Sequence, residues 1–259
     1  MLAPVRHVAR TRWESMPKPT VLLTFDCLAY ADAWTLQHRL LEDRLAGRCL
    51  DTVLLLEHEP VFTVGRSGKP EHWGGDVMAL EIAGIPVRHV ERGGSITYHG
   101  PGQLVLYPIV RLDAACPGPK AYVRRLEEVV LRTLADWGLA GHRLEKQPGV
   151  WIGDPADGMS AKIAAVGVRI VRGVTMHGIA LNVTVDLAPF GLVAPCGMAG
   201  CRVTSLQAAL GRAVAPETVR RQLVRHLADV FDVEWTGGTA AARPSETERE
   251  AVASNGGIA

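Results

Sequence analysis

Two consecutive apolar runs joined by a tight turn constrain the fold of this 259-residue chain most strongly. Ile163 to Val171 and Val174 to Val183 are both rich in β-forming residues, and only Arg172 and Gly173 separate them. A two-residue connection that contains glycine is typical of a β-hairpin. The chain is therefore predicted to build a sheet around one long antiparallel pair of strands.

The rest of the chain mixes helices and strands without a regular alternation. Apolar spacing and helix start and stop residues predict helices at 31–46, 120–137 and 216–231 and a short helix at 76–83. Further strands are predicted at 20–25, 52–56, 61–64, 87–90, 103–110 and 233–235, with a glycine-rich loop at 65–75. This irregular order favours an α+β fold, with a mixed or antiparallel sheet and flanking helices, over strict βαβ units.

The composition is that of a globular chain with little net charge. Lysine and arginine number 28 and aspartate and glutamate 27, so the formal charge is 28 − 27 = +1, and 47% of the residues are hydrophobic. Such a balance supplies no broad field for nucleic acid or an anionic membrane, and neither is expected as a partner. Apolar runs also stop far short of the roughly 20 residues that span a bilayer. We expect a soluble protein.

The ends of the chain differ from its centre. Residues 1–18 carry Arg6, Arg10 and Arg12 without a continuous apolar run, which excludes a secretory signal and leaves a transit peptide as the weaker alternative. A folded domain is expected over 19–236 and a disordered tail over 237–259. Five cysteines are too few, and odd in number, for a disulfide framework, which favours the cytoplasm. Cysteine and histidine spacing predicts no metal site.

A glycine-rich segment from Arg92 to Gln103 is too polar to belong to a core. Adjacent glycines let the backbone approach a ligand closely, and their N–H groups can meet a carbonyl or phosphate oxygen. The spacing matches neither of the common nucleotide-binding fingerprints. The alternative is a hairpin loop, in which Arg92 is solvated and His99 is simply hydrogen-bonded.

A second segment joins Lys162 to the small residues of the predicted hairpin. Lys162 opens an apolar strand, and its ammonium group can project into a pocket whose walls are Ala165, Gly167, Gly178 and Ala180. The alternative is a lysine at the strand edge that keeps its charged end in water. His177, next to these walls, is read either as a site residue or as a structural histidine.

The third segment contains two cysteines, Cys196 and Cys201. Cys196 lies between Pro195 and Gly197, on a turn whose backbone N–H groups can stabilise a thiolate. The alternative is an inert, buried thiol, which is the reading given to the remaining three cysteines. Spacing alone does not choose between Cys196 and Cys201, although the tighter turn favours Cys196.

Together these segments resemble the lipoyl(octanoyl) transferase family over about residues 20 to 235. The resemblance rests on four motifs in the family's order: Glu57-His58-Glu59-Pro60-Val61-Phe62-Thr63; Arg92-Gly93-Gly94 through Tyr98-His99-Gly100-Pro101-Gly102-Gln103; Lys162 with Ala165-Val166-Gly167 and His177-Gly178-Ile179-Ala180-Leu181-Asn182; and Pro195-Cys196-Gly197. Leu106 and Ile179 depart from the family pattern. Both departures bear on pocket shape and leave the chemistry intact.

The resemblance implies the α+β fold of biotin and lipoate ligases, the class II synthetase and biotin ligase type. It implies transfer of an octanoyl group from octanoyl-acyl carrier protein to a lysine on a lipoyl domain of a 2-oxoacid dehydrogenase or of the glycine cleavage system. Cys196 resembles the nucleophile that carries the acyl thioester, and Lys162 resembles its activating partner. No cofactor is implied, and a monomer suffices for the mechanism.

The resemblance also implies the residues that bind the acyl chain. They are Arg92, Gly93, Gly94, Ser95, Ile96, Thr97, Tyr98, His99, Ala165, Val166, Gly167, Gly178, Ile179 and Ala180. Two other functions remain open at this point. One is a lipoate or biotin ligase that activates a free acid with ATP, and the other is an acyl-binding protein without catalysis.

Overall fold

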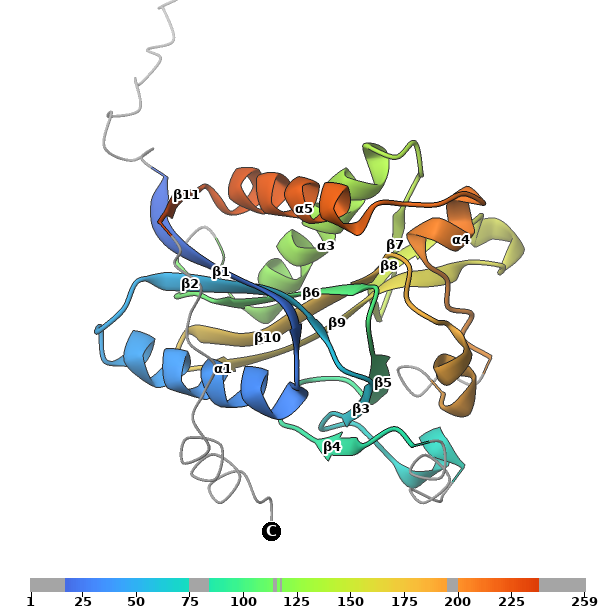
Figure 1. The fold of residues 1–259 in the computed structure, drawn as a ribbon, viewed down its shortest axis with the longest axis horizontal. Coiled ribbons are helices and arrows are strands. Elements are labelled where there is room, and N and C mark those ends of the chain that lie inside the picture. The colour runs from blue at the N-terminus through green and yellow to red at the C-terminus, as the bar shows by residue number, and fades with distance from the viewer. Residues whose placement is uncertain (1–16, 75–83, 114–115, 117, 195–199, 238–259) are drawn as a thin grey trace, which may run out of the picture.

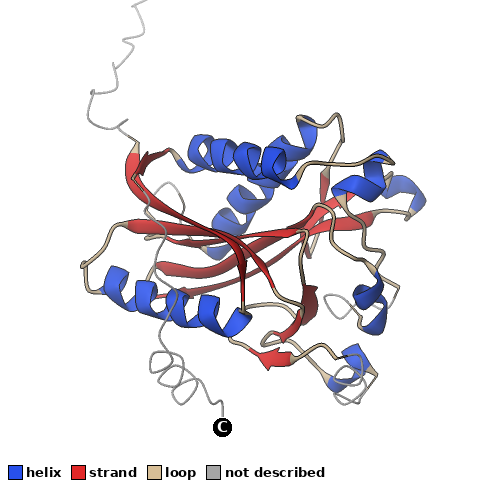
Figure 2. Cartoon of the chain, in the orientation of Figure 1, coloured by secondary structure: helices blue, strands red, loops and turns tan. Residues whose placement is uncertain are grey.

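The computed structural model describes residues 17–74, 84–113, 116, 118–194 and 200–237 (Figures 1 and 2). The strands are β1 (Lys18–Leu28), β2 (Asp51–His58), β3 (Val61–Val64), β4 (Val87–His89), β5 (Ile96–His99), β6 (Gln103–Ile109), β7 (His142–Leu144), β8 (Gln147–Ile152), β9 (Ala161–Val171), β10 (Val174–Asn182) and β11 (Val233–Thr236). The α-helices are α1 (Tyr30–Leu45), α3 (Pro119–Ala135), α4 (Leu206–Leu210) and α5 (Pro216–Phe231). Short 3-10 helices lie at Pro70–Trp73, Pro155–Asp157 and Ala188–Leu192.

A mixed sheet of eight strands forms the centre of the molecule, in the order β11-β1-β2-β6-β10-β9-β8-β7. β1 runs parallel to both β11 and β2, whereas the pairs from β2 through β6, β10, β9 and β8 to β7 are antiparallel. A second sheet, in the order β4-β3-β5, lies at one end of the first (Figure 1). The loop from Gly100 to Gly102 therefore connects the small sheet to the large one.

Helices cover both faces of the large sheet (Figure 2). α3 and α5 lie on one face, where Tyr122, Leu126 and Leu223 pack against Val53 and Leu55 of β2. Burying each such side chain contributes about 1.5 to 3 kcal/mol. Proline in the first turn of α3 and of α5 fits the helix start, where its missing N–H is not needed.

α1 covers the opposite face of the same strands. Leu54 and Leu56 alternate with Val53 and Leu55 along β2, so they point to the other side and pack with Ala33 and Leu36 of α1. The small sheet has a separate core, in which Phe62 and Tyr98 pack against Phe190. The site described below lies where the α1 face of the large sheet meets this small sheet.

Most of the predicted elements are confirmed, with shifts at their ends. The hairpin is β9 and β10, in register from Val171 opposite Val174 to Ala164 opposite Leu181. The three long helices differ from prediction by at most two residues at either end. β2 and β3 do not pair with each other, because the bend at Glu59-Pro60 sends them into different sheets.

Three strands and one α-helix were missed, as were the three short 3-10 helices, and three predictions lie outside the described ranges. β5, β7 and α4 have four, three and five residues, and β8 contains Pro148 and Gly149, so periodicity gives little signal for them. The predicted helix at 76–83 and almost all of the predicted extension and tail cannot be compared with the structure. Within the described ranges, no helix combines the length and apolar character needed to cross a membrane.

Candidate active site

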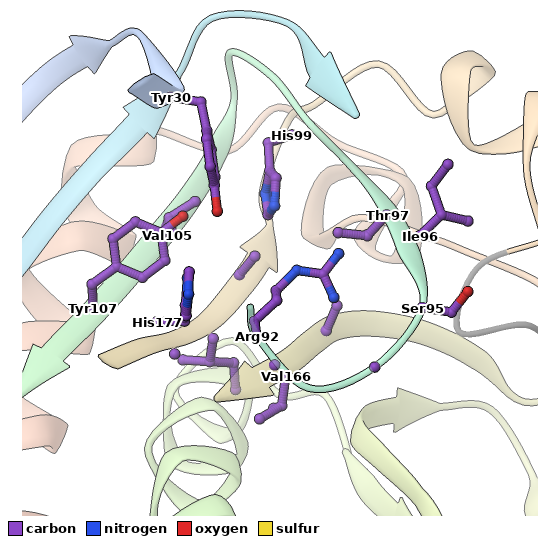
Figure 3. A pocket seen from close by; sticks show the side chains of 16 residues that line it. Tyr30, Arg92, Ser95, Ile96, Thr97, His99, Val105, Tyr107, Val166 and His177 are labelled. Atoms are coloured by element: carbon purple, nitrogen blue, oxygen red, sulfur yellow. The ribbon is translucent and has the colours of Figure 1, made fainter. Parts of the chain in front are cut away.

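A pocket with an empty volume of about 470 Å³ lies between the two sheets on the α1 side (Figure 3). Three parts of the sequence build it: the start of α1, the stretch from the loop before β5 through β5 and β6, and the hairpin of β9 and β10. Its lining residues are Tyr30, Arg92, Gly94, Ser95, Ile96, Thr97, His99, Val105, Tyr107, Ala165, Val166, Gly167, His177, Gly178, Ile179 and Ala180. Most of this lining is apolar or small.

The two ends of the pocket differ in exposure. The open end is formed by Gly94, which is exposed, and by residues 165–167 of β9, which are half-buried. The closed end is formed by Tyr30, Tyr107 and His177, which are 5%, 4% and 1% exposed. Figure 3 shows Ser95 and Ile96 on the side of the pocket away from Tyr30 and Tyr107. The entrance to the pocket is therefore near Gly94, and Tyr30, Tyr107 and His177 lie at its far end.

Small residues of the hairpin have two separate roles. Ala165 and Ala180 are opposite one another on β9 and β10, and both line the pocket. The neighbouring pair, Gly167 and Gly178, allows other backbone to approach. A Cβ on Gly178 would lie 2.0 Å from the Leu106 carbonyl oxygen, and one on Gly167 would lie 2.9 Å from that of Gly93. The prediction that small side chains leave room for a ligand thus applies to Ala165 and Ala180, whereas the two glycines make room for neighbouring backbone.

We therefore expect Gly178→Ala to destabilise the fold. The new methyl group overlaps backbone, so β6 and β10 must separate, at a cost of about 1 to 3 kcal/mol or more. Urea unfolding measures this change, and Gly191→Ala is the matched control, because a Cβ there meets nothing within 4 Å. Equal stability of the two variants would show that β6 does not approach Gly178 as described.

Arg92 is buried, which rules out the reading of a solvated loop arginine. It is 8% exposed, and its Nη2 donates hydrogen bonds to the carbonyl oxygen of Thr63 at 2.6 Å and to Thr63 Oγ1 at 2.8 Å. Its Nη1 donates to the Gly93 carbonyl oxygen at 3.0 Å. Arg92 therefore fixes the glycine-rich loop to β3 beside the pocket.

A chain of hydrogen bonds continues from this arginine through His99. The ring Nδ1 of His99 donates to Gln103 Oε1 at 2.6 Å, and Nε2 accepts from Thr63 Oγ1 at 3.2 Å. Gln103 Nε2 donates to Asn182 Oδ1 at 2.9 Å, and Asn182 Nδ2 donates to the Thr204 carbonyl oxygen. Burial, together with the neighbouring His58 and Arg92, lowers the pKa of His99 well below its usual range. His99 is therefore a neutral, fixed wall of the pocket.

His58 is held in the same way behind the pocket. Its Nδ1 donates to the Leu28 carbonyl oxygen at 2.9 Å, and its Nε2 accepts from the Tyr107 hydroxyl at 2.8 Å. Burial lowers the pKa of His58 to about 4. These bonds use the hydroxyl of Tyr107 and set the position of its ring.

His177 adopts an uncommon backbone conformation. Its φ of 59° lies in the left-handed region, which costs a non-glycine residue about 1 to 3 kcal/mol. Its N–H donates to Gln37 Oε1 of α1 at 2.9 Å, which holds this conformation, and its ring lines the closed end. Burial lowers its pKa to about 3, although Glu91 opposes this effect. The positive φ thus turns an imidazole toward the pocket.

These depressed histidine pKa values predict that the protein loses stability in mild acid. In the unfolded chain, histidine binds a proton near pH 6.5, whereas His58 and His177 remain neutral in the folded protein until about pH 4 and 3. Each neutral buried histidine therefore contributes its full share to the free energy of unfolding above pH 6.5. This share falls as the pH is lowered, by about 2 kcal/mol per histidine at pH 5. Urea unfolding at pH 7.5 and pH 5 measures it. Equal free energies of unfolding at both values would contradict the prediction.

Lys162 is buried outside the pocket lining, on the same strand as Ala165. The residue is 3% exposed, its Nζ donates to the Pro148 carbonyl oxygen at 3.2 Å, and the Trp151 ring centroid lies 4.6 Å from Nζ. A buried ammonium does not fit the alternative of a lysine that keeps its charge in water. At about 3.3 Å per residue, Lys162 lies roughly 10 Å from Ala165 along β9.

Cys196 lies outside the described residues, but the chain on either side of it is described. Before it, the Ala194 N–H donates to the His72 carbonyl oxygen at 2.6 Å, and the His72 ring contacts the Ser95 hydroxyl at 2.5 Å. After it, the Lys162 N–H donates to the Arg202 carbonyl oxygen at 2.8 Å. Cys201, the alternative thiol, immediately precedes Arg202 and is half-buried.

The structure places twelve of the fourteen predicted acyl-binding residues in the pocket lining, as counted from the lining residues given above. The exceptions are Gly93, whose N–H donates to the Val168 carbonyl oxygen, and Tyr98, which packs in the core of the small sheet. Of the two departures from the family pattern, Ile179 lines the pocket and Leu106 packs on the α3 side of the sheet. Lining residues absent from the predicted set are Tyr30, Val105, Tyr107 and His177.

Comparisons with known proteins agree on one family. Residues 29–228 match the family described as lipoyl protein ligase A/B catalytic domain. An octanoyltransferase of Thermobifida fusca is 47% identical over 204 residues, covering 78% of this chain and 84% of that protein. An octanoyltransferase of Chloroflexus aurantiacus is 44% identical over 208 residues, covering 80% of this chain and 92% of that protein.

A solved structure shares the fold at low sequence identity. Lipoate-protein ligase A bound with ATP superposes with a TM-score of 0.64 at 17% identity, covering 93% of this chain and 94% of that one. This likeness confirms the predicted lipoate-ligase-like α+β fold. The chain belongs to the lipoyl protein ligase A/B catalytic domain family and, within it, to the octanoyltransferases, which are acyltransferases of protein lipoylation.

Proposed function

We propose that this protein transfers an octanoyl group from octanoyl-acyl carrier protein to a lysine of lipoyl domains, through a thioester on Cys196. The observation that carries the proposal is the pocket between the two sheets, which is apolar along β9 and β10, the first of which also carries the buried Lys162 three residues before Ala165. An eight-carbon chain suits such a lining. In this proposal its carbonyl carbon remains at the open end, where a nucleophile can attack it.

The two carrier proteins need not bind at once if the enzyme holds the acyl group between two half-reactions. In the first half-reaction, the Cys196 thiolate attacks the thioester carbonyl carbon and the carrier thiolate leaves and takes a proton. In the second, the neutral amine of the acceptor lysine attacks the new thioester. An amide forms, the Cys196 thiolate leaves, and the amine loses its extra proton.

The described neighbours of Cys196 support this assignment. Ala194 is bonded to His72, which contacts Ser95 in the pocket lining, and Arg202 is bonded to Lys162. The chain thus enters the Cys196 segment beside the pocket and leaves it beside the lysine. We assign to Lys162 the role of stabilising the thiolate by its charge and of carrying the proton in each half-reaction.

The partners and location proposed here follow from the same reaction. The donor is octanoyl-acyl carrier protein, and the acceptors are lipoyl domains of 2-oxoacid dehydrogenase complexes and the glycine cleavage carrier protein. We propose a monomer with one catalytic domain over 19–236, acting in the cytoplasm, where free thiols persist. Cys27, Cys49, Cys116 and Cys201 are thiols in the structure, consistent with that location.

One assay separates this proposal from an ATP-dependent ligase of the same fold. The protein is incubated with an apo lipoyl domain and either octanoyl-acyl carrier protein alone or octanoate with ATP. Acylation of the lipoyl domain in the first mixture alone is the expected result. Acylation in the second mixture alone would contradict the proposal, and no acylation in either would favour an acyl-binding protein.

We expect Ala180→Leu to obstruct the acyl pocket. The larger side chain enters the wall opposite Ala165 and should weaken octanoyl binding by about 1 to 3 kcal/mol if the wall is rigid. Transfer of octanoyl should therefore slow more than transfer of butanoyl, as measured by the kcat/KM of each donor. An equal loss for both chain lengths would indicate damage to the fold.

A further inference from the structure

Two buried polar side chains at the closed end of the pocket have no hydrogen-bond partner among the described residues. They are Tyr30, through its hydroxyl, and His177, through both ring nitrogens. Tyr30 is 5% and His177 1% exposed. His177 Nε2 lies 4.0 Å from Glu91 Oε2, which is too long for a hydrogen bond.

Two polar neighbours in the pocket lining are satisfied, whereas Nε2 of Gln37, the residue that accepts from the His177 N–H, also has no partner among the described residues. The Tyr107 hydroxyl donates to His58, and both ring nitrogens of His99 are bonded. Buried polar atoms in native proteins nearly always find a partner in protein, water or ligand. The unpaired hydroxyl of Tyr30 and ring nitrogens of His177 therefore indicate a hydrogen-bonding partner that enters the pocket.

Both side chains are directed into the pocket. Tyr30 and His177 belong to its lining, and Figure 3 shows the Tyr30 hydroxyl between Tyr107 and His99 and the His177 ring between Tyr107 and Arg92. The N–H of His177 is bonded to Gln37, which fixes the backbone from which the ring projects. A group bound there would meet a hydroxyl and an imidazole together.

The charges around this end favour a neutral ligand group. Burial lowers the pKa of His177 to about 3, so the neutral ring offers one donor and one acceptor. Glu91, whose pKa is lowered to about 2, lies near the ring and disfavours an anion there. The Arg92 guanidinium in the same lining disfavours a cation. A hydroxyl group, which both donates and accepts, matches this environment.

We propose that Tyr30 and His177 form a polar subsite that binds one hydroxyl group at the closed end of the acyl pocket. The hydroxyl comes either from a water molecule behind an alkyl chain or from a hydroxyl carried at the end of the chain. The inference rests on the proposed function only in assuming that the pocket holds an acyl chain. An alkyl chain long enough to displace the water leaves both side chains unpaired and binds less well.

The test compares two acids of the same size that differ only at the last atom, ω-hydroxyoctanoate and nonanoate. Titration calorimetry with the whole chain measures the binding of each acid, together with octanoate. We expect the hydroxy acid to bind about tenfold more tightly than nonanoate, the size of effect seen when a buried polar group keeps its partner. Octanoate, which leaves room for water, should also bind more tightly than nonanoate.

Tyr30→Phe removes one hydroxyl without changing the shape of the pocket. This variant should reduce the preference for the hydroxy acid to about threefold or less. Tyr122→Phe is the matched control, since Tyr122 is a buried tyrosine whose hydroxyl bonds the Pro108 carbonyl oxygen on the α3 side. The control should keep the full preference. A preference unchanged in Tyr30→Phe would overturn the role of Tyr30.

If Tyr30→Phe fails to fold, the comparison of the two acids in the unmodified protein still tests the proposal. Equal binding of nonanoate and ω-hydroxyoctanoate would overturn the polar subsite. Because the measurement uses free acids and no transfer, a protein that lacks octanoyl transfer activity can still show the preference. That result would contradict the proposed function and support the subsite, whereas no binding of any acid would contradict both.

Discussion

Cys196→Ala is expected to abolish octanoyl transfer, with a loss in kcat on the order of 10⁴-fold or more. Removing the nucleophile of a covalent mechanism leaves no group that can hold the acyl chain between the two half-reactions. The assay is the rate at which a lipoyl domain is acylated from octanoyl-acyl carrier protein. Binding of octanoate should change little, because the part of the pocket lining that the structure describes lies on other segments.

Cys201→Ala is the matched control for this experiment. Cys201 is a half-buried thiol five positions later in the sequence, next to the residue bonded to the Lys162 N–H. We expect the Cys201 variant to keep most of the transfer rate. Loss of acyl transfer in the Cys201 variant, with activity retained in the Cys196 variant, would mean that the other thiol is the nucleophile.

Lys162→Met should have the second-largest effect, through the reactivity of the thiol. An unperturbed cysteine has a pKa of about 8.5, and an ammonium nearby favours its thiolate. We expect the pH midpoint of Cys196 alkylation by iodoacetamide to rise by about one unit or more in the variant. Transfer should slow about 10²-fold, since proton transfer by a positioned group contributes at least that much.

The methionine variant is designed to keep the fold. Its side chain fills most of the apolar space of the lysine stem, and the sulfur can pack on the Trp151 ring that now lies beneath Nζ. Lys120→Met, at an exposed position in the first turn of α3, removes a charge elsewhere and should leave the alkylation profile unchanged. If Lys162→Met leaves the pH dependence of Cys196 alkylation unchanged, Lys162 is not the partner of the thiol and another group must carry the proton.

The long hairpin shows what the sequence makes predictable. β9 and β10 were found because β-forming residues fill two runs around a two-residue turn, a local signal that needs no tertiary information. The same holds for α3 and α5, whose apolar spacing is regular. β5 was missed because Ile96 to His99 is too short and lies between glycine-rich turns, so only pairing with β3 reveals it.

The residues of the pocket are only partly predictable from the sequence. Arg92, Ser95 and Ala165 were predicted because motifs surround them, and the pocket contains all three. Tyr30 has no motif of its own, because it reaches the pocket from a helix start. Tyr107 stands next to Leu106 in a stretch of the family pattern, but its strand has the apolar composition of ordinary core, so it was not assigned to the pocket. His177 carried a usable signal, since it stands next to Gly178, but its positive φ depends on contact with Gln37 and cannot be read from spacing.

Intact-protein mass spectrometry after addition of octanoyl-acyl carrier protein, without any acceptor, tests the central proposal most directly. The account predicts one octanoyl adduct per chain, mapped by peptide analysis to Cys196, and its disappearance when an apo lipoyl domain is added. An acylated lipoyl domain produced with no adduct at any time on the millisecond scale would contradict the covalent relay. An adduct on a different residue would contradict the assignment of Cys196.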